Sequence, residues 1–193
     1  MILFCATTNP GKLREFQQAA KAAGLEVQEV PDMRRIEPPE ETGDTFAENA
    51  ILKAVYYSHH ALGPVFCDDS GLVVDALRGA PGVYSARYAG AEAADRANND
   101  LLMRNMRGQT NRACRFVCVI ALARGGELVR TFEGVIEGRL LEEERGSGGF
   151  GYDPLFYYPP FGCTLAEASL KQKQDISHRG QALGKMFRFA AGL

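Results

Sequence analysis

The sequence predicts an α/β fold in which helices flank a mixed β-sheet. Residues 2–6 form a short continuous apolar run, which is typical of a strand buried on both faces, and a capped helix follows it. Residues 114–123 form a long apolar strand, and Gly125 and Gly126 turn it into an antiparallel partner at 127–136. A strand–helix unit and a long hairpin in one chain favour a mixed sheet over a purely parallel one.

Composition limits the classes of protein that this chain can belong to. With 193 residues and 46% hydrophobic content, the chain can form one sizeable core or one domain with two lobes. The 22 Lys and Arg against 24 Asp and Glu argue against nucleic-acid binding by bulk charge. Five scattered cysteines favour buried, reduced thiols. Since neither a signal peptide nor a segment of transmembrane length is found, we expect a soluble, cytoplasmic protein without nucleic-acid or membrane partners.

Residues 7–12, Thr-Thr-Asn-Pro-Gly-Lys, open the first helix. Asn9 is a natural N-cap, and Pro10 suits the first helical position. Backbone N–H groups at this helix start, together with two hydroxyls and Lys12, would bind an anion. The segment is not a Walker P-loop, because the upstream glycine is absent and Leu13 replaces the hydroxyl residue that binds Mg²⁺. An ordinary capped helix with a surface lysine is the alternative interpretation.

The chain continues with a strand at 25–30 and an acidic, proline-containing loop that ends at Gly43. A capping box at 45–48 then opens a helix that runs to about Leu62. On this helix Lys53 is either a solvated lysine or points toward the paired aspartates described next, since the following strand returns beside it.

Residues 65–67 indicate the end of a buried strand, followed by Asp68 and Asp69, with Ser70 next and a sharp turn at Gly71. Adjacent carboxylates raise each other's proton affinity, and a divalent cation removes that cost. Oxygen donors of this kind suit Mg²⁺. A polar turn built from Asp-Ser-Gly is the alternative interpretation.

The remaining segments complete the expected elements. Residues 79–88 are too rich in Gly and Pro for a regular element and too aromatic for an idle loop, while 92–106 are expected to be helical. Near the end of the chain, Ser177 can cap the last helix, which places His178 and Arg179 in its first turn. Two cations there oppose the helix dipole, and such a conflict indicates either a functional site or a solvated helix start.

The glycine-rich segment 146–151 satisfies G-x-G-x-x-G but is not a Rossmann fingerprint, because Pro154 forbids the helix that this motif must open. We interpret it as a flexible loop that packs against a flat ligand. Phe150 and Tyr152 would supply stacking surfaces and Asp153 a hydrogen-bond partner. A structural turn with core aromatics is the alternative.

Six segments in this order carry a resemblance that each one alone does not. They are Thr-Thr-Asn-Pro-Gly-Lys at 7–12, Glu-Thr-Gly-Asp-Thr-Phe-Ala-Glu-Asn-Ala at 41–50, Asp-Asp-Ser-Gly at 68–71, Gly-Ala-Pro-Gly-Val-Tyr-Ser-Ala-Arg-Tyr at 79–88, Gly-Gly-Phe-Gly-Tyr-Asp-Pro at 148–154 and Ile-Ser-His-Arg-Gly-Gln-Ala-Leu at 176–183. Together they resemble the inosine triphosphate pyrophosphatase family, which removes dITP, ITP and XTP from the nucleotide pool. The likeness covers nearly the whole chain.

The resemblance implies an elongated α/β fold of two lobes on a long mixed β-sheet flanked by helices, formed as a single domain over residues 1–193. It implies an active site in the central cleft and a homodimer. The implied reaction is Mg²⁺-dependent hydrolysis of non-standard purine nucleoside triphosphates between the α and β phosphates, which yields the monophosphate and pyrophosphate.

Motif matching also assigns residues to roles. The residues implied to hold the triphosphate are Thr7, Thr8, Asn9, Pro10, Gly11, Lys12 and Lys53. Glu41, preferred over Glu40 from its distance to Phe46, and Asp69 would engage the metal. Asp69 would also accept a proton from the attacking water, with Asp68 in support. The residues implied to line the nucleotide are Ser70, Phe150, Gly151, Tyr152, Asp153, Lys173, His178 and Arg179.

Two other functions compete with this interpretation. One is a Maf-like nucleotide pyrophosphatase of different specificity, and the other is a non-catalytic protein that binds purine nucleotides. Inosine and xanthine carry an oxygen acceptor at the six-position, so an inosine triphosphate pyrophosphatase needs a hydrogen-bond donor facing that oxygen. The rigid guanidinium of Arg179 is the preferred candidate. A pyrophosphate-release assay separates the three functions.

Overall fold

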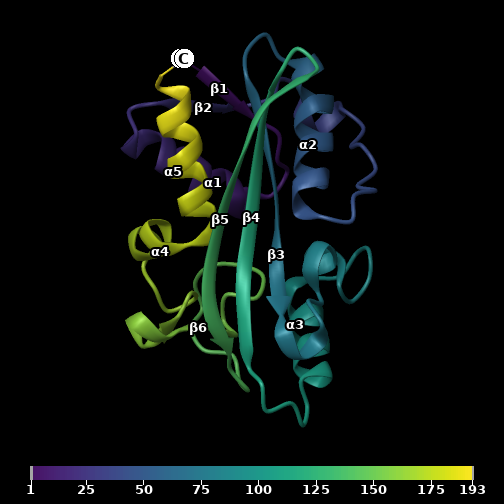
Figure 1. The fold of residues 1–193 in the computed structure, drawn as a ribbon, viewed down its shortest axis with the longest axis vertical. Coiled ribbons are helices and arrows are strands. Elements are labelled where there is room, and N and C mark those ends of the chain that lie inside the picture. Colours follow the sequence, from purple (N-terminus) through teal and green to yellow (C-terminus); the bar gives the residue numbers. More distant parts are fainter. Residues whose placement is uncertain (1, 193) are drawn as a thin grey trace. The chain divides into compact units, whose positions relative to one another are not determined.

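The computed structural model describes residues 2–192, and its elements are labelled in Figure 1. The strands are β1 (Ile2–Cys5), β2 (Glu26–Glu29), β3 (Val65–Val74), β4 (Ala113–Arg124), β5 (Glu127–Leu140), β6 (Phe156–Tyr158) and β7 (Cys163–Thr164). The helices are α1 (Pro10–Ala22), α2 (Phe46–Tyr57), α3 (Asp95–Asn105), α4 (Leu170–Ile176) and α5 (His178–Ala190).

The strands of the described range form one sheet in the order β2-β1-β3-β4-β5-β6-β7. Strand β1 is parallel to both β2 and β3, whereas β6 is antiparallel to β5 and to β7. The sheet is therefore mixed, which confirms the predicted α/β class. The chain forms two compact units: unit 1 comprises the chain up to Asp69, Cys118–Gly134 and the chain from His178 onward, and unit 2 comprises Ser70–Val117 and Val135–Ser177.

In unit 1, helices cover both faces of the sheet, and the alternation of side chains along β4 shows how. Cys118, Ile120 and Leu122 belong to the core under α1 and α5, whereas Val119 and Ala121 belong to the core under α2. Figure 1 shows α1 and α5 together on one side of these strands and α2 on the other. Because successive side chains of a strand point to opposite faces, a continuous apolar run such as β4 is needed for this arrangement.

Unit 2 has its own core. Leu102 and Met106, at the C-terminal part of α3, pack with residues of β3, β4 and β5. Phe116 and Phe156 contribute adjacent rings whose centroids lie 4.7 Å apart. Tyr152 is buried in the same cluster. The loop that contains Tyr152 is thereby attached to the core of this unit.

The largest correction to the predicted elements concerns the aspartate pair. The sequence predicts a strand that ends at Cys67 and a sharp turn at Gly71, but β3 continues through both positions to Val74. Leu72 and Val74 are fully buried in the unit 2 core. The strand also pairs with β4, and with β1 at its start, where Phe4 and Cys5 lie opposite Val65 and Phe66. Pairing and burial therefore override the turn preference of Asp-Ser-Gly.

Smaller differences concern the end of one helix and two short helices that were not predicted. Helix α2 ends at Tyr57, and a 3₁₀ turn (Ser58–His60) replaces the expected last turn, where the Ser58 hydroxyl donates to Val55 O and accepts the Gly126 N–H. Residues 79–88 contain a 3₁₀ helix (Gly82–Arg87) that was not expected. Helix α4 was also not predicted, although Ser169 and Gln172 give it a capping box.

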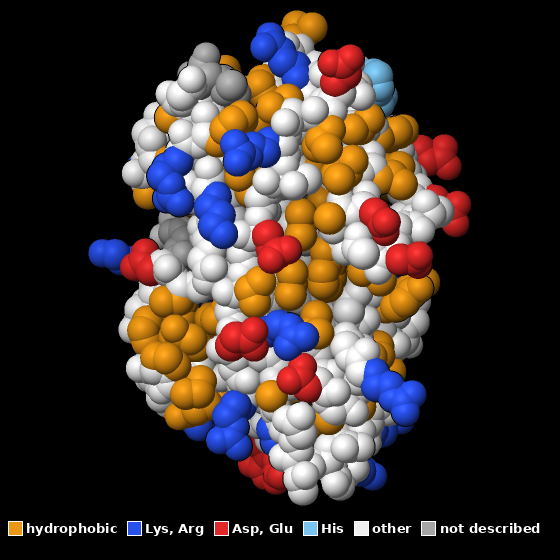
Figure 2. Space-filling model, viewed as in Figure 1, with side chains coloured by type: hydrophobic (Ala, Val, Ile, Leu, Met, Phe, Trp, Pro, Cys, Tyr) orange, Lys and Arg blue, Asp and Glu red, His pale blue; other side chains and the backbone are white. Residues whose placement is uncertain are grey.

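The surface and the thiols agree with the composition. On the face drawn in Figure 2, Lys and Arg side chains are interspersed with Asp and Glu, in keeping with a net charge of -2. Within residues 2–192, none of the helices combines the length and apolar character needed to cross a membrane. The five cysteines are free thiols, four of them buried, as predicted.

Candidate active site

The start of α1 is capped as the sequence predicts. Asn9 Oδ1 accepts the backbone N–H groups of Gly11 at 2.8 Å and Lys12 at 3.1 Å, and Thr7 Oγ1 accepts the N–H of Asn9 at 3.2 Å. Thr7 and Gly11 are buried, whereas Thr8 and Asn9 are exposed. The positive end of the helix dipole therefore lies next to exposed polar residues, which suits an anion.

The register of the sheet brings the aspartates beside this loop. Strand β1 runs parallel to β3 with Cys5 opposite Phe66, and β1 ends there while β3 continues to Asp68 and Asp69. Lys12 Nζ, from the first turn of α1, reaches Asp68 Oδ1 at 3.0 Å. The predicted phosphate loop and the predicted aspartate pair thus lie together in unit 1.

Lys53 of α2 lies between two carboxylates. Its Nζ is 3.0 Å from Glu41 Oε1 and 3.3 Å from Asp69 Oδ1, so the prediction that it points toward the aspartates is confirmed. Burial lowers the pKa of the Lys53 ammonium, but Asp69 and Glu41 raise it by more, and the net pKa lies above the ordinary value. Glu40, the alternative to Glu41, is exposed.

A second, more deeply buried pair of charges supports Asp68. Arg179 Nε donates to Asp68 Oδ2 at 3.3 Å, and its Nη1 donates to Glu15 Oε2 at 2.7 Å. The Arg179 side chain is 4% exposed. Burial lowers its pKa, but Glu15 and Asp68 raise it by more, so the guanidinium remains charged. Lys12, Asp68, Arg179 and Glu15 form a chain of alternating charges in unit 1.

Arg179 and His178 reach this place because α5 approaches the sheet closely. A Cβ at Gly134 of β5 would collide with the backbone oxygen of His178 and would lie 2.9 Å from the Ala182 nitrogen. Helix α5 begins at His178, so His178 and Arg179 do occupy its first turn, as predicted. Gly134 thus permits the approach that places Arg179 beside Asp68.

The two adjacent aspartates have different environments. Burial raises the pKa of Asp68, but Lys12, Arg179 and Lys53 together lower it by more, and the net pKa lies well below its usual range. Burial raises the pKa of Asp69; Lys53 lowers it, but Glu41 adds to the increase, and the net pKa is raised. Paired carboxylates whose environments separate their pKa values are suited to different roles.

A second group of predicted site residues gathers in unit 2. Lys173 Nζ lies 2.7 Å from Asp153 Oδ2 and 4.6 Å from the centroid of the Phe150 ring. Asp153 Oδ2 also accepts the Phe150 N–H at 2.9 Å. Gly149 has φ of 71°, and a Cβ there would collide with the Asp153 carboxylate. The loop before Asp153 therefore depends on glycine for its shape.

Three other predicted residues lie apart from these contacts. The Tyr152 hydroxyl donates to Ser85 O at 2.8 Å and the residue is 4% exposed, so its ring packs in the unit 2 core and does not offer a stacking surface. The Gly151 N–H donates to Asp95 Oδ2 at 2.7 Å. Ser70 is half-buried within β3.

Sequence reasoning missed two buried residues of the unit 1 group. Glu15 is 6% exposed and holds Arg179, although a glutamate in an amphipathic helix is normally expected to be solvated. Asn49 is fully buried and donates to Asp69 Oδ2 at 3.4 Å. Its spacing of four from Lys53 on one helix face was the available signal.

The donor set suits a magnesium ion. Glu41 and Asp69 each bring an oxygen to the same cationic nitrogen of Lys53 within 3.3 Å, so the two carboxylates converge on one positive charge. Mg²⁺ is usually held by one or two carboxylates together with substrate phosphates and water. Among the described residues, no group of three or more His, Cys, Asp or Glu side chains forms a ready metal site.

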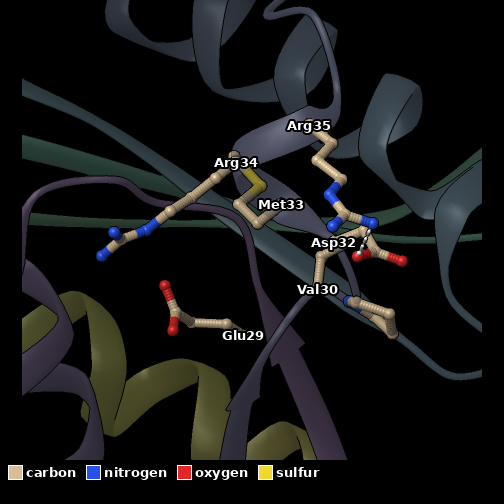
Figure 3. A pocket seen from close by; sticks show the side chains of 7 residues that line it. Glu29, Val30, Asp32, Met33, Arg34 and Arg35 are labelled. Carbon is tan, nitrogen blue, oxygen red and sulfur yellow. Dashed lines mark ion pairs between the residues drawn. The ribbon is translucent and has the colours of Figure 1, made fainter.

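A surface hollow of about 430 Å³ lies where β2 ends, and Figure 3 shows its lining. In this view the Arg34 and Glu29 side chains both extend to the left, and Arg35 pairs with Asp32 at 3.4 Å on the right. All four side chains are exposed, and their charges balance. The hollow therefore lacks the buried polar groups that distinguish the Lys53 and Lys12 contacts.

Comparisons with known proteins point to one family. The model of the Ham1 family matches residues 3–189. A dITP/XTP pyrophosphatase of an Exiguobacterium species is 48% identical over 186 residues, which cover 96% of this chain and 95% of the relative. A dITP/XTP pyrophosphatase of Acidobacterium capsulatum is 49% identical over 192 residues, with 95% of each chain covered.

Solved structures agree. A HAM1 protein from Coxiella burnetii superposes with a TM-score of 0.89 at 36% identity, over the full length of both chains. The Ham1 protein of Staphylococcus aureus gives a TM-score of 0.87 at 38% identity, over 100% of this chain and 99% of that one. On the strength of the family model and of relatives that match nearly the whole chain, this protein belongs to the Ham1 family.

Proposed function

We propose that this protein is a nucleoside triphosphate pyrophosphatase that hydrolyses dITP, XTP and ITP. Water adds across the α–β anhydride bond and gives the nucleoside monophosphate and pyrophosphate. The observation that carries this proposal is the unit 1 group, in which Lys12 pairs with Asp68, and Lys53 with Glu41 and Asp69, beside the N-terminus of α1.

The cations of this group bind the substrate. A triphosphate is strongly anionic, and Lys12, Lys53 and the helix N-terminus supply the positive charge that it needs. The residues assigned to the triphosphate are Thr7, Thr8, Asn9, Pro10, Gly11, Lys12 and Lys53. Their proposed task is positioning and charge stabilisation, on which phosphoryl transfer largely depends.

The carboxylates supply the rest of the chemistry. Asp69 accepts the proton of the attacking water, and Asp68, held ionised by Lys12 and Arg179, keeps those cations in place. Glu41 and Asp69 would hold Mg²⁺, which when bound withdraws charge from phosphate oxygens. Their oxygens converge on one point, as a shared cation requires.

The nucleoside is assigned to the remaining predicted residues. They are Ser70, Phe150, Gly151, Tyr152, Asp153, Lys173, His178 and Arg179. Of these, Tyr152 acts from the core by fixing the loop, while the half-buried Phe150 offers its ring. We further propose that the chain is one two-lobed domain, that it assembles as a homodimer and that it acts in the cytoplasm.

The test is pyrophosphate release by the purified protein with ITP, dITP, XTP, ATP and GTP, each with Mg²⁺ and with excess EDTA. We expect the deaminated nucleotides to exceed ATP in kcat/KM by up to about 10⁴-fold, because a site that hydrogen-bonds one group rejects analogues that lack it. An Asp69→Asn preparation purified in the same way serves as the control for contaminating phosphatases, since it lacks the proposed proton acceptor. Release of orthophosphate, or equal rates for ATP and ITP, would overturn the proposal.

A further inference from the structure

The buried amide of Asn49 has no part in the proposed chemistry, yet all its polar bonds go to the loop and the strand that carry the carboxylates. Asn49 follows the capping box at the start of α2 and is 0% exposed. Asparagine is a poor helix former, and a buried amide is costly unless its donors and acceptor are paired. The contacts of the Asn49 side chain should therefore explain why an asparagine occupies this buried helical position.

Two of these contacts fix the backbone of one loop residue. Asn49 Oδ1 accepts the Gly43 N–H at 2.8 Å, and Nδ2 donates to Gly43 O at 3.3 Å. A Cβ on Gly43 would lie 2.6 Å from Glu48 Cβ and 2.7 Å from Asn49 Oδ1. Only glycine lets the loop approach this closely, so Gly43 and Asn49 form a matched pair.

The third contact joins the loop to β3. Asn49 Nδ2 also donates to Asp69 Oδ2 at 3.4 Å, while Lys53 Nζ contacts the other oxygen, Oδ1, at 3.3 Å. Lys53 Nζ also contacts Glu41, which lies two residues before Gly43. Asn49 and Lys53 are one helical turn apart and share a face of α2. The result is a closed ring that runs from Asp69 through Asn49 and Gly43 to Glu41, and back through Lys53.

We infer that Asn49 is a positioning residue that sets the spacing between Glu41 and Asp69 before a metal ion arrives. The inference rests on the proposed roles of these two carboxylates in metal binding. Lys53 holds the two carboxylates by their oxygens, with an ion pair to each and a hydrogen bond to Asp69 Oδ1, and a divalent cation competes for the same oxygens. Asn49 instead holds the loop by its backbone at Gly43, and so the spacing does not depend on what occupies the space between the carboxylates.

The test compares Asn49→Ala with a matched control, Asn98→Ala. Asn98 is also buried, at 3% exposure, and its amide makes the same pair of bonds to a loop: Oδ1 accepts the Ala89 N–H at 2.8 Å and Nδ2 donates to Ala86 O at 3.2 Å. Neither of these two Asn98 bonds goes to a carboxylate. Both variants lose a buried amide that hydrogen-bonds to the backbone of another segment, but only Asn49→Ala disturbs Asp69 and the loop that carries Glu41.

The primary measurement is Mn²⁺ binding by electron paramagnetic resonance, with no nucleotide present. We expect Asn49→Ala to weaken Mn²⁺ binding by roughly 10–100-fold, the usual effect of removing a partner behind metal ligands, and Asn98→Ala to leave it unchanged. The Mg²⁺ concentration for half-maximal turnover should rise by a similar factor in Asn49→Ala, while kcat at saturating Mg²⁺ changes much less. Amide exchange should accelerate at Gly43 in one variant and at Ala89 in the other.

Gly43→Ala disrupts the same Gly43–Asn49 hydrogen bonds from the loop and leaves the sequence of α2 unchanged. It provides the second variant if Asn49→Ala does not fold. Equal Mn²⁺ affinity in the parent and in either of these variants would overturn the inference, as would an equal loss in Asn98→Ala. A parent protein that neither binds Mn²⁺ nor releases pyrophosphate would instead overturn the proposed function, so the two failures are distinguishable.

Discussion

Replacing Glu15 with alanine removes one of the two carboxylates that hold the Arg179 guanidinium in unit 1. Glu15 Oε2 accepts from Nη1 at 2.7 Å, and the two side chains are 8% and 4% exposed. After the substitution Asp68, at 3.3 Å from Nε, remains as the other carboxylate contact shown for that arginine, and Asp68 also pairs with Lys12. The perturbation therefore removes one of these two carboxylates from a buried cation.

The expected cost follows from the burial of the pair. Removing one partner of a buried ion pair typically lowers the free energy of unfolding by about 3–5 kcal/mol, because the other charge stays buried. Since Asp68 still contacts Arg179, we expect Glu15→Ala to fall near the lower end, at about 3 kcal/mol. Glu15→Gln keeps an acceptor for Nη1 but loses the charge, and should cost about 1–2 kcal/mol.

The assay is urea unfolding followed by far-ultraviolet circular dichroism, without nucleotide. The matched control is Asp75→Ala, which breaks the Arg115–Asp75 pair, where Nη1 and Oδ1 are 3.0 Å apart but the side chains are 36% and 41% exposed. An exposed pair of this kind contributes about 0.2–1 kcal/mol. Raising the salt concentration should reduce the Asp75 effect and leave the Glu15 effect nearly unchanged, because buried pairs are screened less.

A Glu15→Ala protein that loses no more stability than Asp75→Ala would refute this reasoning. So would a Glu15→Gln protein that is as unstable as Glu15→Ala, because the charge and the acceptor would then not contribute separately. Either result would mean that Arg179 finds other compensation in the folded state.

Three further predictions concern the unit 1 group. Asp69→Asn should lower kcat by at least about 10²–10⁴ while the circular dichroism spectrum stays unchanged, since it removes the proton acceptor, and activity within a few-fold of the parent would contradict this role. Lys12→Ala and Lys53→Ala should each raise KM for ITP and for ATP by similar factors, because both nucleotides carry the same phosphates; a variant that affects one base selectively would show that its lysine is misassigned. The lowered pKa of Asp68 stabilises the fold above the ordinary carboxyl pKa, and this contribution is lost as pH falls toward the folded-state value. The urea midpoint of the parent should therefore fall more steeply below about pH 4 than that of Asp68→Asn, and parallel curves would contradict the assignment.

Local signals allowed the starts of α1 and α2 to be predicted from the sequence. The Asn9 side chain accepts hydrogen bonds from residues two and three positions further along the chain. Thr45 and Glu48, which are three residues apart, each accept the other's backbone N–H with their side chains. Such bonds need no distant partner, so residue type and spacing suffice. The direction of Lys53 could be anticipated for the same reason, because the strand that follows α2 in the chain carries its partner.

Long-range contacts explain what the sequence could not show. Asp68–Gly71 has the composition of a turn, and it is extended because it lies within β3, which pairs with β4 and continues into the buried Leu72 and Val74. Glu15 bonds to Arg179, which is 164 residues away, and nothing near Glu15 indicates that it is buried. Asn49 lies between these cases: its partner Gly43 is six residues away, and a glycine placed just before a capping box was a signal that could have been used.

Four of the five thiols are buried, which leaves Cys163 as a position for selective chemical labelling. Burial is the main factor that raises the pKa of Cys5 and Cys114 to about 12, and it also raises those of Cys67 and Cys118, so these four thiols stay protonated and shielded at neutral pH. Cys163 in β7 is half-buried, and thiol reagents attack the thiolate of an accessible cysteine. A maleimide dye should therefore attach to unit 2 of the unmodified protein at this position, and the remaining cysteines should take up dye only as the chain unfolds.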